Sequence, residues 1–108
     1  MQESTPVSID LNSESKLNES FLMGFGNAVK TILGQLMSGG SWDIIPVSVR
    51  GTRSQISAFS KALSKEKSYL ETYLGLGLNN PRTYYSKNEL NKAVQKFEKE
   101  TGIKWPFN

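Results

Sequence analysis

Residues 17–37, LNESFLMGFGNAVKTILGQLM, carry the strongest periodic pattern in the chain, and this pattern decides the expected fold class. Apolar side chains recur at spacings of three and four, which places them on one face of a helix. Gly24, Gly26 and Gly34 each lower the intrinsic helix propensity by ~1 kcal/mol relative to alanine, so the helix needs a surface to pack against. The apolar residues are Leu17, Phe21, Leu22, Phe25, Val29, Ile32, Leu33, Leu36 and Met37.

The preceding residues 1–16, MQESTPVSIDLNSESK, are mostly polar and predict an extended or disordered N-terminal arm. Val7, Ile9 and Leu11 nevertheless alternate with polar residues, which is the period of a half-buried strand, so docking of the arm as an edge strand is the alternative. The arm and the helix together form the expected partner-binding surface. Its residues are Val7, Ile9, Leu11, Phe21, Leu22, Phe25, Val29, Ile32, Leu33 and Leu36.

After the helix, Ser38-Gly39-Gly40-Ser41 predicts a helix stop and a hinge. We therefore expect three parts: the arm at 1–16, the amphipathic helix and hinge at 17–41, and a basic body at 42–108. The body opens with Ile45, Val47 and Val49 at alternating positions, a pattern that predicts a short edge strand. A lone strand is not stable, so its partner is either the arm or a sheet edge of another protein.

Two helices are expected in the body. Thr52 and Gln55 have the spacing of a capping box, and a helix should run from there to about Tyr73. Ser86 and Glu89 have the same spacing and predict the start of a second helix. Between the two helices, glycine, asparagine and proline predict a loop longer than a helix-turn-helix connection.

The end of the last helix is marked by Gly102, a residue suited to the left-handed position after a helix, with Ile103 expected to fold back on Phe97 in a Schellman motif. Trp105 and Phe107 should then seal the core of the body. The expected fold is mainly α, a small α+β domain: an extended arm, an amphipathic helix, a short edge strand and two capped helices with an aromatic C-terminal tail.

Composition excludes several kinds of chemistry. The 108-residue chain contains no histidine and no cysteine, so it lacks an imidazole base, the usual zinc ligands and any disulfide. No catalytic residue, cofactor, metal or small-molecule substrate is expected. The first fifteen residues are polar and acidic, so they do not predict a secretory signal. A membrane partner is not expected either, because an interfacial helix usually carries more lysine and arginine on its polar face than residues 17–37 do.

Charge is distributed unevenly along the chain. Residues 1–43 hold two lysines against five acidic residues, whereas residues 44–108 hold eleven lysines and arginines against five acidic residues. An acidic arm on a basic body is consistent with anion or nucleic-acid binding, or with a solvated surface that keeps the protein soluble. The candidate anion-binding residues are Arg50, Arg53, Lys61, Lys65, Arg82, Lys92, Lys96 and Lys99.

Each of these candidates has an ordinary structural alternative. Arg50 and Arg53 flank a helix start, which favours anions but is also plain capping. The lysines lie in two helical stripes, which is also typical of a solvated helix face. Tyr84 and Tyr85 beside Arg82 are suited to stacking on bases or to covering the loop.

Three stretches, VSVRGTRSQISAF (47–59), EKSYLETYLGLGLNNPRTYYSKNEL (66–90) and FEKETGIKWPF (97–107), resemble small, mostly uncharacterised proteins of tailed bacteriophages. The resemblance implies a virion, prohead or accessory protein that works by binding, located in the virion or the host cytoplasm. With the unpartnered arm and helix, it favours a non-enzymatic structural or adaptor protein that binds a protein partner, forms a homo-oligomer or joins a larger assembly. The alternatives are a basic nucleic-acid-binding accessory protein and a small inhibitor of a host protein.

Overall fold

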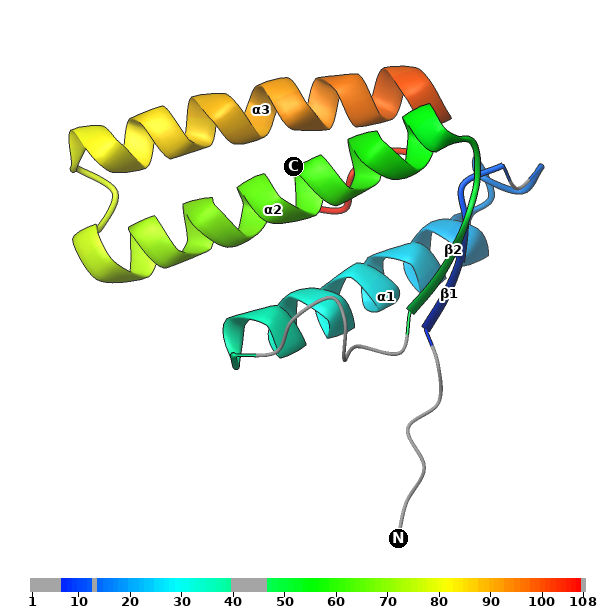
Figure 1. The fold of residues 1–108 in the computed structure, drawn as a ribbon, viewed down its shortest axis with the longest axis horizontal. Coiled ribbons are helices and arrows are strands. Elements are labelled where there is room, and N and C mark those ends of the chain that lie inside the picture. Colours follow the sequence, from blue (N-terminus) through cyan, green and yellow to red (C-terminus); the bar gives the residue numbers. More distant parts are fainter. Residues whose placement is uncertain (1–6, 13, 40–46, 108) are drawn as a thin grey trace, which may run out of the picture.

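The computed structural model describes residues 7–12, 14–39 and 47–107, which form two strands and three helices. The order is β1 (Val7–Asp10), α1 (Glu19–Met37), β2 (Val47–Arg50), α2 (Arg53–Leu76) and α3 (Pro81–Thr101). Figure 1 shows α2 and α3 side by side as an antiparallel hairpin, with α1 beneath the hairpin and the strands near one end of it. The prediction of a mainly α, small α+β fold is confirmed.

The two strands pair in parallel, with Ile9 opposite Val49 and Asp10 opposite Arg50. Leu11 extends the pairing, because its N–H donates to the Arg50 carbonyl at 2.8 Å. Parallel strands require a crossover connection, and α1 is that connection. The chain's own arm is therefore the partner of the second strand. Residues 1–6, 13 and 40–46, which include parts of the predicted arm, hinge and edge strand, lie outside the described residues.

Helix α1 begins after Asn18, whose side chain accepts a hydrogen bond from the Ser20 N–H at 2.8 Å. Leu17 precedes this cap and is 84% exposed, so it does not belong to the buried face on which its spacing placed it. Five residues of the predicted stripe are buried, namely Phe25, Val29, Ile32, Leu33 and Leu36. Three others are only partly buried, namely Phe21, Leu22 and Met37.

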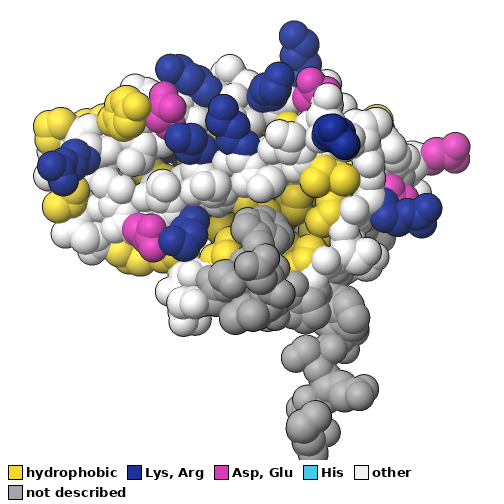
Figure 2. Space-filling view, viewed as in Figure 1, with side chains coloured by type: hydrophobic (Ala, Val, Ile, Leu, Met, Phe, Trp, Pro, Cys, Tyr) yellow, Lys and Arg dark blue, Asp and Glu magenta, His cyan; other side chains and the backbone are white. Residues whose placement is uncertain are grey.

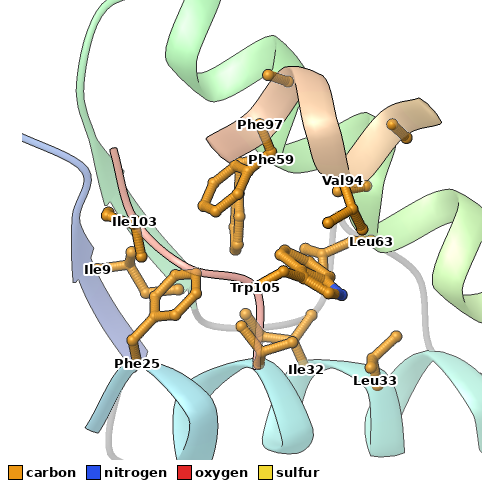
Figure 3. Packing of buried hydrophobic residues seen from close by; sticks show 14 of the residues in the cluster. Ile9, Phe25, Ile32, Leu33, Phe59, Leu63, Val94, Phe97, Ile103 and Trp105 are labelled. Carbon is orange, nitrogen blue, oxygen red and sulfur yellow. The ribbon is translucent and has the colours of Figure 1, made fainter. Parts of the chain in front are cut away.

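One core joins α1 to the hairpin. Trp105 is 1% exposed, and its ring lies at the centre of this core (Figure 3). The Trp105 and Phe97 ring centroids are 5.2 Å apart in an edge-to-face arrangement, and Phe25 and Phe59 each lie 6.3 Å from Trp105. The prediction that the aromatic tail seals the core is confirmed, and the core that it seals includes α1.

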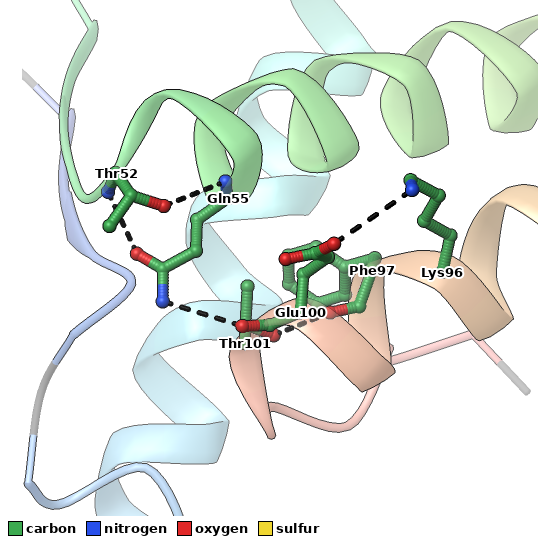
Figure 4. A network of polar contacts seen from close by, with 6 residues as sticks. All are labelled: Thr52, Gln55, Lys96, Phe97, Glu100 and Thr101. Atoms are coloured by element: carbon green, nitrogen blue, oxygen red, sulfur yellow. Dashed lines mark hydrogen bonds and ion pairs between the residues drawn. The ribbon is translucent and has the colours of Figure 1, made fainter.

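The predicted capping box at the start of α2 is confirmed. The Thr52 N–H donates to Gln55 Oε1 at 2.8 Å, and the Gln55 N–H donates to Thr52 Oγ1 at 3.1 Å. Gln55 Nε2 also donates to the Glu100 carbonyl at 3.4 Å, which links this end of α2 to the end of α3 (Figure 4). A Cβ on Gly51 would lie 2.9 Å from Gln55 Oε1 and 3.1 Å from the Leu11 side chain, so a larger residue here would displace the Gln55 side chain and press on Leu11.

The predicted start of the last helix is wrong. Helix α3 begins at Pro81, and Ser86 lies inside it. Asn80 is the N-cap, with its side chain accepting from the Arg82 N–H at 2.9 Å, and proline is favoured at the first helical position because it needs no N–H partner. Helix α2 also runs past Tyr73 to Leu76, so the loop spans only residues 77–80. The predicted long loop is therefore wrong as well.

The C-terminal end of α3 has the predicted left-handed glycine, Gly102, with φ of 73°. The Gly102 N–H donates to the Glu98 carbonyl at 2.8 Å, which is the αL motif rather than the expected Schellman motif. The Ile103 N–H instead donates to Thr101 Oγ1 at 3.0 Å. Lys16, from the segment before α1, donates from Nζ to the Thr101 carbonyl at 2.8 Å. It thus satisfies a backbone carbonyl at the C-terminal end of α3 with a positive charge.

The indole of Trp105 donates from Nε1 to Glu66 Oε1 on α2 at 2.8 Å. Glu66 is only 4% exposed. Its burial raises the pKa of the carboxyl above the ordinary 4.5, and the hydrogen bond from Trp105 and the charge of Lys87 oppose this rise only in part. A buried carboxylate thus anchors the tail.

We expect Trp105→Ala to lower the free energy of unfolding by about 3–5 kcal/mol, because it removes the ring at the centre of the core and the donor to Glu66. Deletion of residues 104–108 should unfold the chain. Urea denaturation measures the first effect, and Tyr84→Ala is the matched aromatic control, since Tyr84 is 60% exposed. Equal losses for the two alanine variants would contradict the central place of Trp105.

The raised pKa of Glu66 predicts a pH dependence of stability. The native state binds the proton of the Glu66 carboxyl more tightly than the unfolded chain does. The protonated carboxyl therefore contributes to stability at pH values below the ordinary pKa, and this contribution is lost as pH rises through the raised pKa. Glu66→Gln keeps an oxygen for the Trp105 N–H and removes the buried charge. The variant should melt at a higher temperature than the wild type at neutral pH, and the difference should vanish below pH 4.5. A pH-independent difference between the two proteins would refute this account.

Candidate functional site

The part of the α2–α3 hairpin that leads to its loop bears an exposed apolar surface, which we call the hairpin tip. Figure 1 shows that the hairpin projects beyond the end of α1, and Figure 2 shows hydrophobic side chains gathered at the projecting end. Side chains of the hairpin tip are between 40% and 72% exposed. They are Tyr73, Leu74, Leu76, Leu78, Tyr84 and Tyr85.

Backbone and side-chain hydrogen bonds hold the loop of the hairpin tip in one shape. Gly77 has φ of 82° and ψ of 174°, and its N–H donates to the Tyr73 carbonyl at 2.8 Å. The hydroxyl of Thr83, which is 2% exposed, donates to the Gly77 carbonyl at 2.6 Å across the loop. With Asn80 capping α3, these hydrogen bonds link the end of α2 to the start of α3 and fix the loop between them.

The hairpin tip is large for an exposed apolar surface. Its three tyrosines, at roughly 200 Å² of surface each, leave on the order of 300 Å² exposed before the leucines are added. The largest apolar patch on a typical monomer is about 300–600 Å², and such patches often mark a binding site. Between Thr72 and Ser86, Arg82 is the only charged residue. The tip is therefore suited to an apolar partner surface with an acidic side chain near Arg82.

A second surface lies along the same hairpin, on the face where Figure 2 shows lysine and arginine side chains above α2 and α3. Here the two helices form a groove of about 200 Å³. We call it the basic groove, and its lining residues are Lys61, Lys65, Glu89, Lys92, Ala93 and Lys96. The two lysine stripes that the sequence predicts on separate helices thus meet at one groove.

Ion pairs in the basic groove are few and long. Glu89 lies 3.7 Å from Lys65 Nζ and 3.3 Å from Lys92 Nζ, so one carboxylate serves two lysines. Lys96 Nζ lies 3.8 Å from Glu100 Oε1, at the edge of the groove (Figure 4). Within residues 7–12, 14–39 and 47–107, Lys61 makes no ion pair. The groove therefore keeps an excess of positive charge.

The other predicted anion-binding residues lie elsewhere. Arg50 and Arg53 flank the start of α2. There the side chains of Thr52 and Gln55 already accept hydrogen bonds from each other's backbone N–H groups. Asp10 stands in register with Arg50 on the neighbouring strand, which places an acidic residue beside this position. Both observations favour capping at this helix start. Of the remaining two, Arg82 is exposed at the hairpin tip and Lys99 is exposed in the last turn of α3.

The expected partner-binding residues mostly face the chain's own core. Seven of the ten are buried there: Ile9, Leu11, Phe25, Val29, Ile32, Leu33 and Leu36. Phe21 and Leu22 are partly buried against the same core. Val7 lies in β1, paired with Val47. The surface that α1 needs is supplied by the hairpin and tail, so the seven buried side chains are not available to a separate partner in this fold.

Sequence reasoning missed the hairpin tip, although a signal was present. Leu74, Leu76 and Leu78 are spaced two residues apart, so they cannot share one buried face of a helix. The predicted long loop also placed Tyr84 and Tyr85 outside any helix, whereas both lie in the first two turns of α3. Both tyrosines are at least 60% exposed, so neither is a buried cover for the loop.

Among the described residues, no group of three or more acidic side chains is arranged to hold a metal ion. None of the helices α1, α2 and α3 is long and apolar enough to cross a membrane. No family model, curated protein or solved structure matches the chain. Its two exposed surfaces are therefore the basis for a functional proposal.

We expect Gly77→Ala to lower the free energy of unfolding by about 1–3 kcal/mol, because the backbone of Gly77 lies in a region that is essentially restricted to glycine. Gly75→Ala is the matched control, since a Cβ there would meet nothing within 4 Å inside the last turns of α2. The control should stabilise the chain by about 0.5–1 kcal/mol. Chemical denaturation of both variants decides the point, and a destabilised Gly75→Ala or an unaffected Gly77→Ala would contradict this geometry.

Proposed function

We propose that this chain is a non-enzymatic assembly or adaptor protein that binds a protein partner through the hairpin tip. The observation that carries the proposal is the exposure of six large apolar side chains at one end of the fold. The core already buries, fully or in part, most of the apolar residues of α1, the strands and the tail. An apolar surface that is left out of a well-filled core is typical of an interface.

The composition of the hairpin tip supports a protein partner. Tyrosine and arginine are enriched among the residues that dominate binding energy at protein interfaces, and the tip holds three tyrosines and Arg82. Because its loop is held by hydrogen bonds, little conformational entropy is lost when the tip docks. A lipid surface is a poorer fit, since interfacial segments usually combine apolar residues with several lysines or arginines.

The resemblance to tailed-bacteriophage proteins implies where the chain would act. On this proposal it is a small virion or accessory component, located in the virion or the host cytoplasm. The partner is then a second copy of the chain or a component of a larger assembly. An inhibitor of a host protein would use the same kind of surface, and the identity of the captured partner separates the two roles.

The test compares two double variants with equal loss of exposed apolar surface. Leu74→Ser with Tyr85→Ser changes the hairpin tip, and Leu17→Ser with Met23→Ser changes exposed residues elsewhere. All four positions are at least 66% exposed, so both variants should unfold within about 0.5 kcal/mol of the wild type. Sedimentation velocity of the purified chain measures self-association, and quantitative capture from the native source measures a different protein partner.

The tip variant should lose at least about tenfold in affinity for the partner, or for a second copy, which corresponds to about 1.4 kcal/mol. The control variant should bind like the wild type. Equal binding by both variants would contradict the proposal, as would binding to lipid vesicles that only the tip variant loses.

A further inference from the structure

We infer that the basic groove binds the phosphate backbone of a nucleic acid, which is a second binding function separate from the hairpin tip. Four lysines and one glutamate line the groove, so it holds three net positive charges. The whole chain has a formal net charge of +3, which means that the remaining charges cancel one another. Residues 44–108 carry a net charge of +6, so the groove holds half of the positive excess of the body, with Glu100 pairing with Lys96 at its edge.

The positions of the lysines suit a linear polyanion. Lys61 and Lys65 are one helical turn apart on α2, and Lys92 and Lys96 are one turn apart on α3. Each pair therefore spans roughly 6 Å along its helix. Helices α2 and α3 are antiparallel neighbours (Figure 1), and both lysine pairs line the groove between them. A strand of phosphates lying along the groove would have ammonium groups on both sides.

The ion pairs that now occupy the groove are weak competitors. Glu89 divides its carboxylate between Lys65 and Lys92, at 3.7 and 3.3 Å, and Lys92 is 77% exposed. The Glu89 and Lys65 side chains are partly buried, at 26% and 33% exposure, but both distances are longer than that of a close ion pair. Surface pairs contribute about 0–1 kcal/mol, so phosphates can replace the glutamate at little cost. Lys61, without an ion pair among the described residues, is available from the start.

The lining of the groove consists of lysine, glutamate and alanine, so it includes no aromatic ring that could stack on bases, and we assign its lysines to phosphates. Contacts to phosphate position a protein on nucleic acid but carry no sequence information. The groove should therefore bind duplexes of unrelated sequence equally well, with an affinity that falls as salt rises.

The experiment measures the affinity of the full chain for duplex DNA, with single-stranded DNA and a poly-glutamate peptide as parallel arms. Lys61→Gln with Lys96→Gln removes two charges from the groove, and Lys30→Gln with Lys67→Gln removes two charges outside it. Glu89→Gln removes the competing carboxylate, and Glu71→Gln, outside the groove, is its control. Thermal melts confirm that each variant is folded.

Each lysine that neutralises a phosphate of a duplex contributes about 0.9 to the slope of log affinity against log salt. The double variant in the groove should therefore lower the slope by about 1.8, and weaken binding roughly 60-fold at ~0.1 M salt if binding at ~1 M salt is unchanged. Glu89→Gln should strengthen binding by up to about fivefold. Lys30→Gln with Lys67→Gln should lose less DNA affinity than the groove variant. Glu71→Gln should not gain DNA affinity.

Equal losses for the two double variants would overturn the inference, because binding would then depend on overall charge and not on the groove. Weaker binding by Glu89→Gln, or tighter binding of poly-glutamate than of DNA, would overturn it as well. The tip variant Leu74→Ser with Tyr85→Ser should keep full DNA affinity, so failure of this inference and failure of the proposed function are separate outcomes.

Discussion

The burial of the Trp105 indole is the interaction on which the rest of the fold depends. Its ring contacts aromatic rings from α1, α2 and α3, and its Nε1 donates to Glu66 at 2.8 Å. The Trp105 backbone N–H donates to Glu98 at 2.9 Å, so the tail is also fixed to α3. A glycine-containing helix such as α1 has little intrinsic stability, and the core around Trp105 is what makes it persist.

This core occupies only one end of the hairpin, so the two ends of α2 and α3 have different surroundings. Near Phe59 and Phe97 the helices face α1 and the tail, whereas toward Gly77 they face each other alone. Polar bonds, such as that between Thr83 and Gly77, hold the projecting part where apolar burial is absent. Leucines and tyrosines there are free for a partner, while the lysines of the basic groove lie farther along the same helices, toward the core.

Most of the fold could be predicted from periodicity and capping, because those signals are local. The buried stripe of α1, the Thr52–Gln55 box and the left-handed Gly102 all follow from side chains within one or two helical turns. Both Asn80-Pro81 and Ser86 are suited to start a helix, and spacing alone could not show that α3 begins at Asn80-Pro81. The parallel direction of the strands, the two faces of the groove and the exposure of the tip depend on long-range packing, which no local pattern encodes.

The position of Trp105 in the sequence has a consequence for how the chain folds as it is synthesised. Ile9 and Trp105 belong to one core but are made 96 residues apart, which at ribosomal rates is a delay of roughly 5 to 20 s. During that interval the apolar stripe of α1 has no completed surface to pack against. The core around α1 can therefore close only after Trp105 has left the ribosome, so the final packing of this helix is a late step of folding.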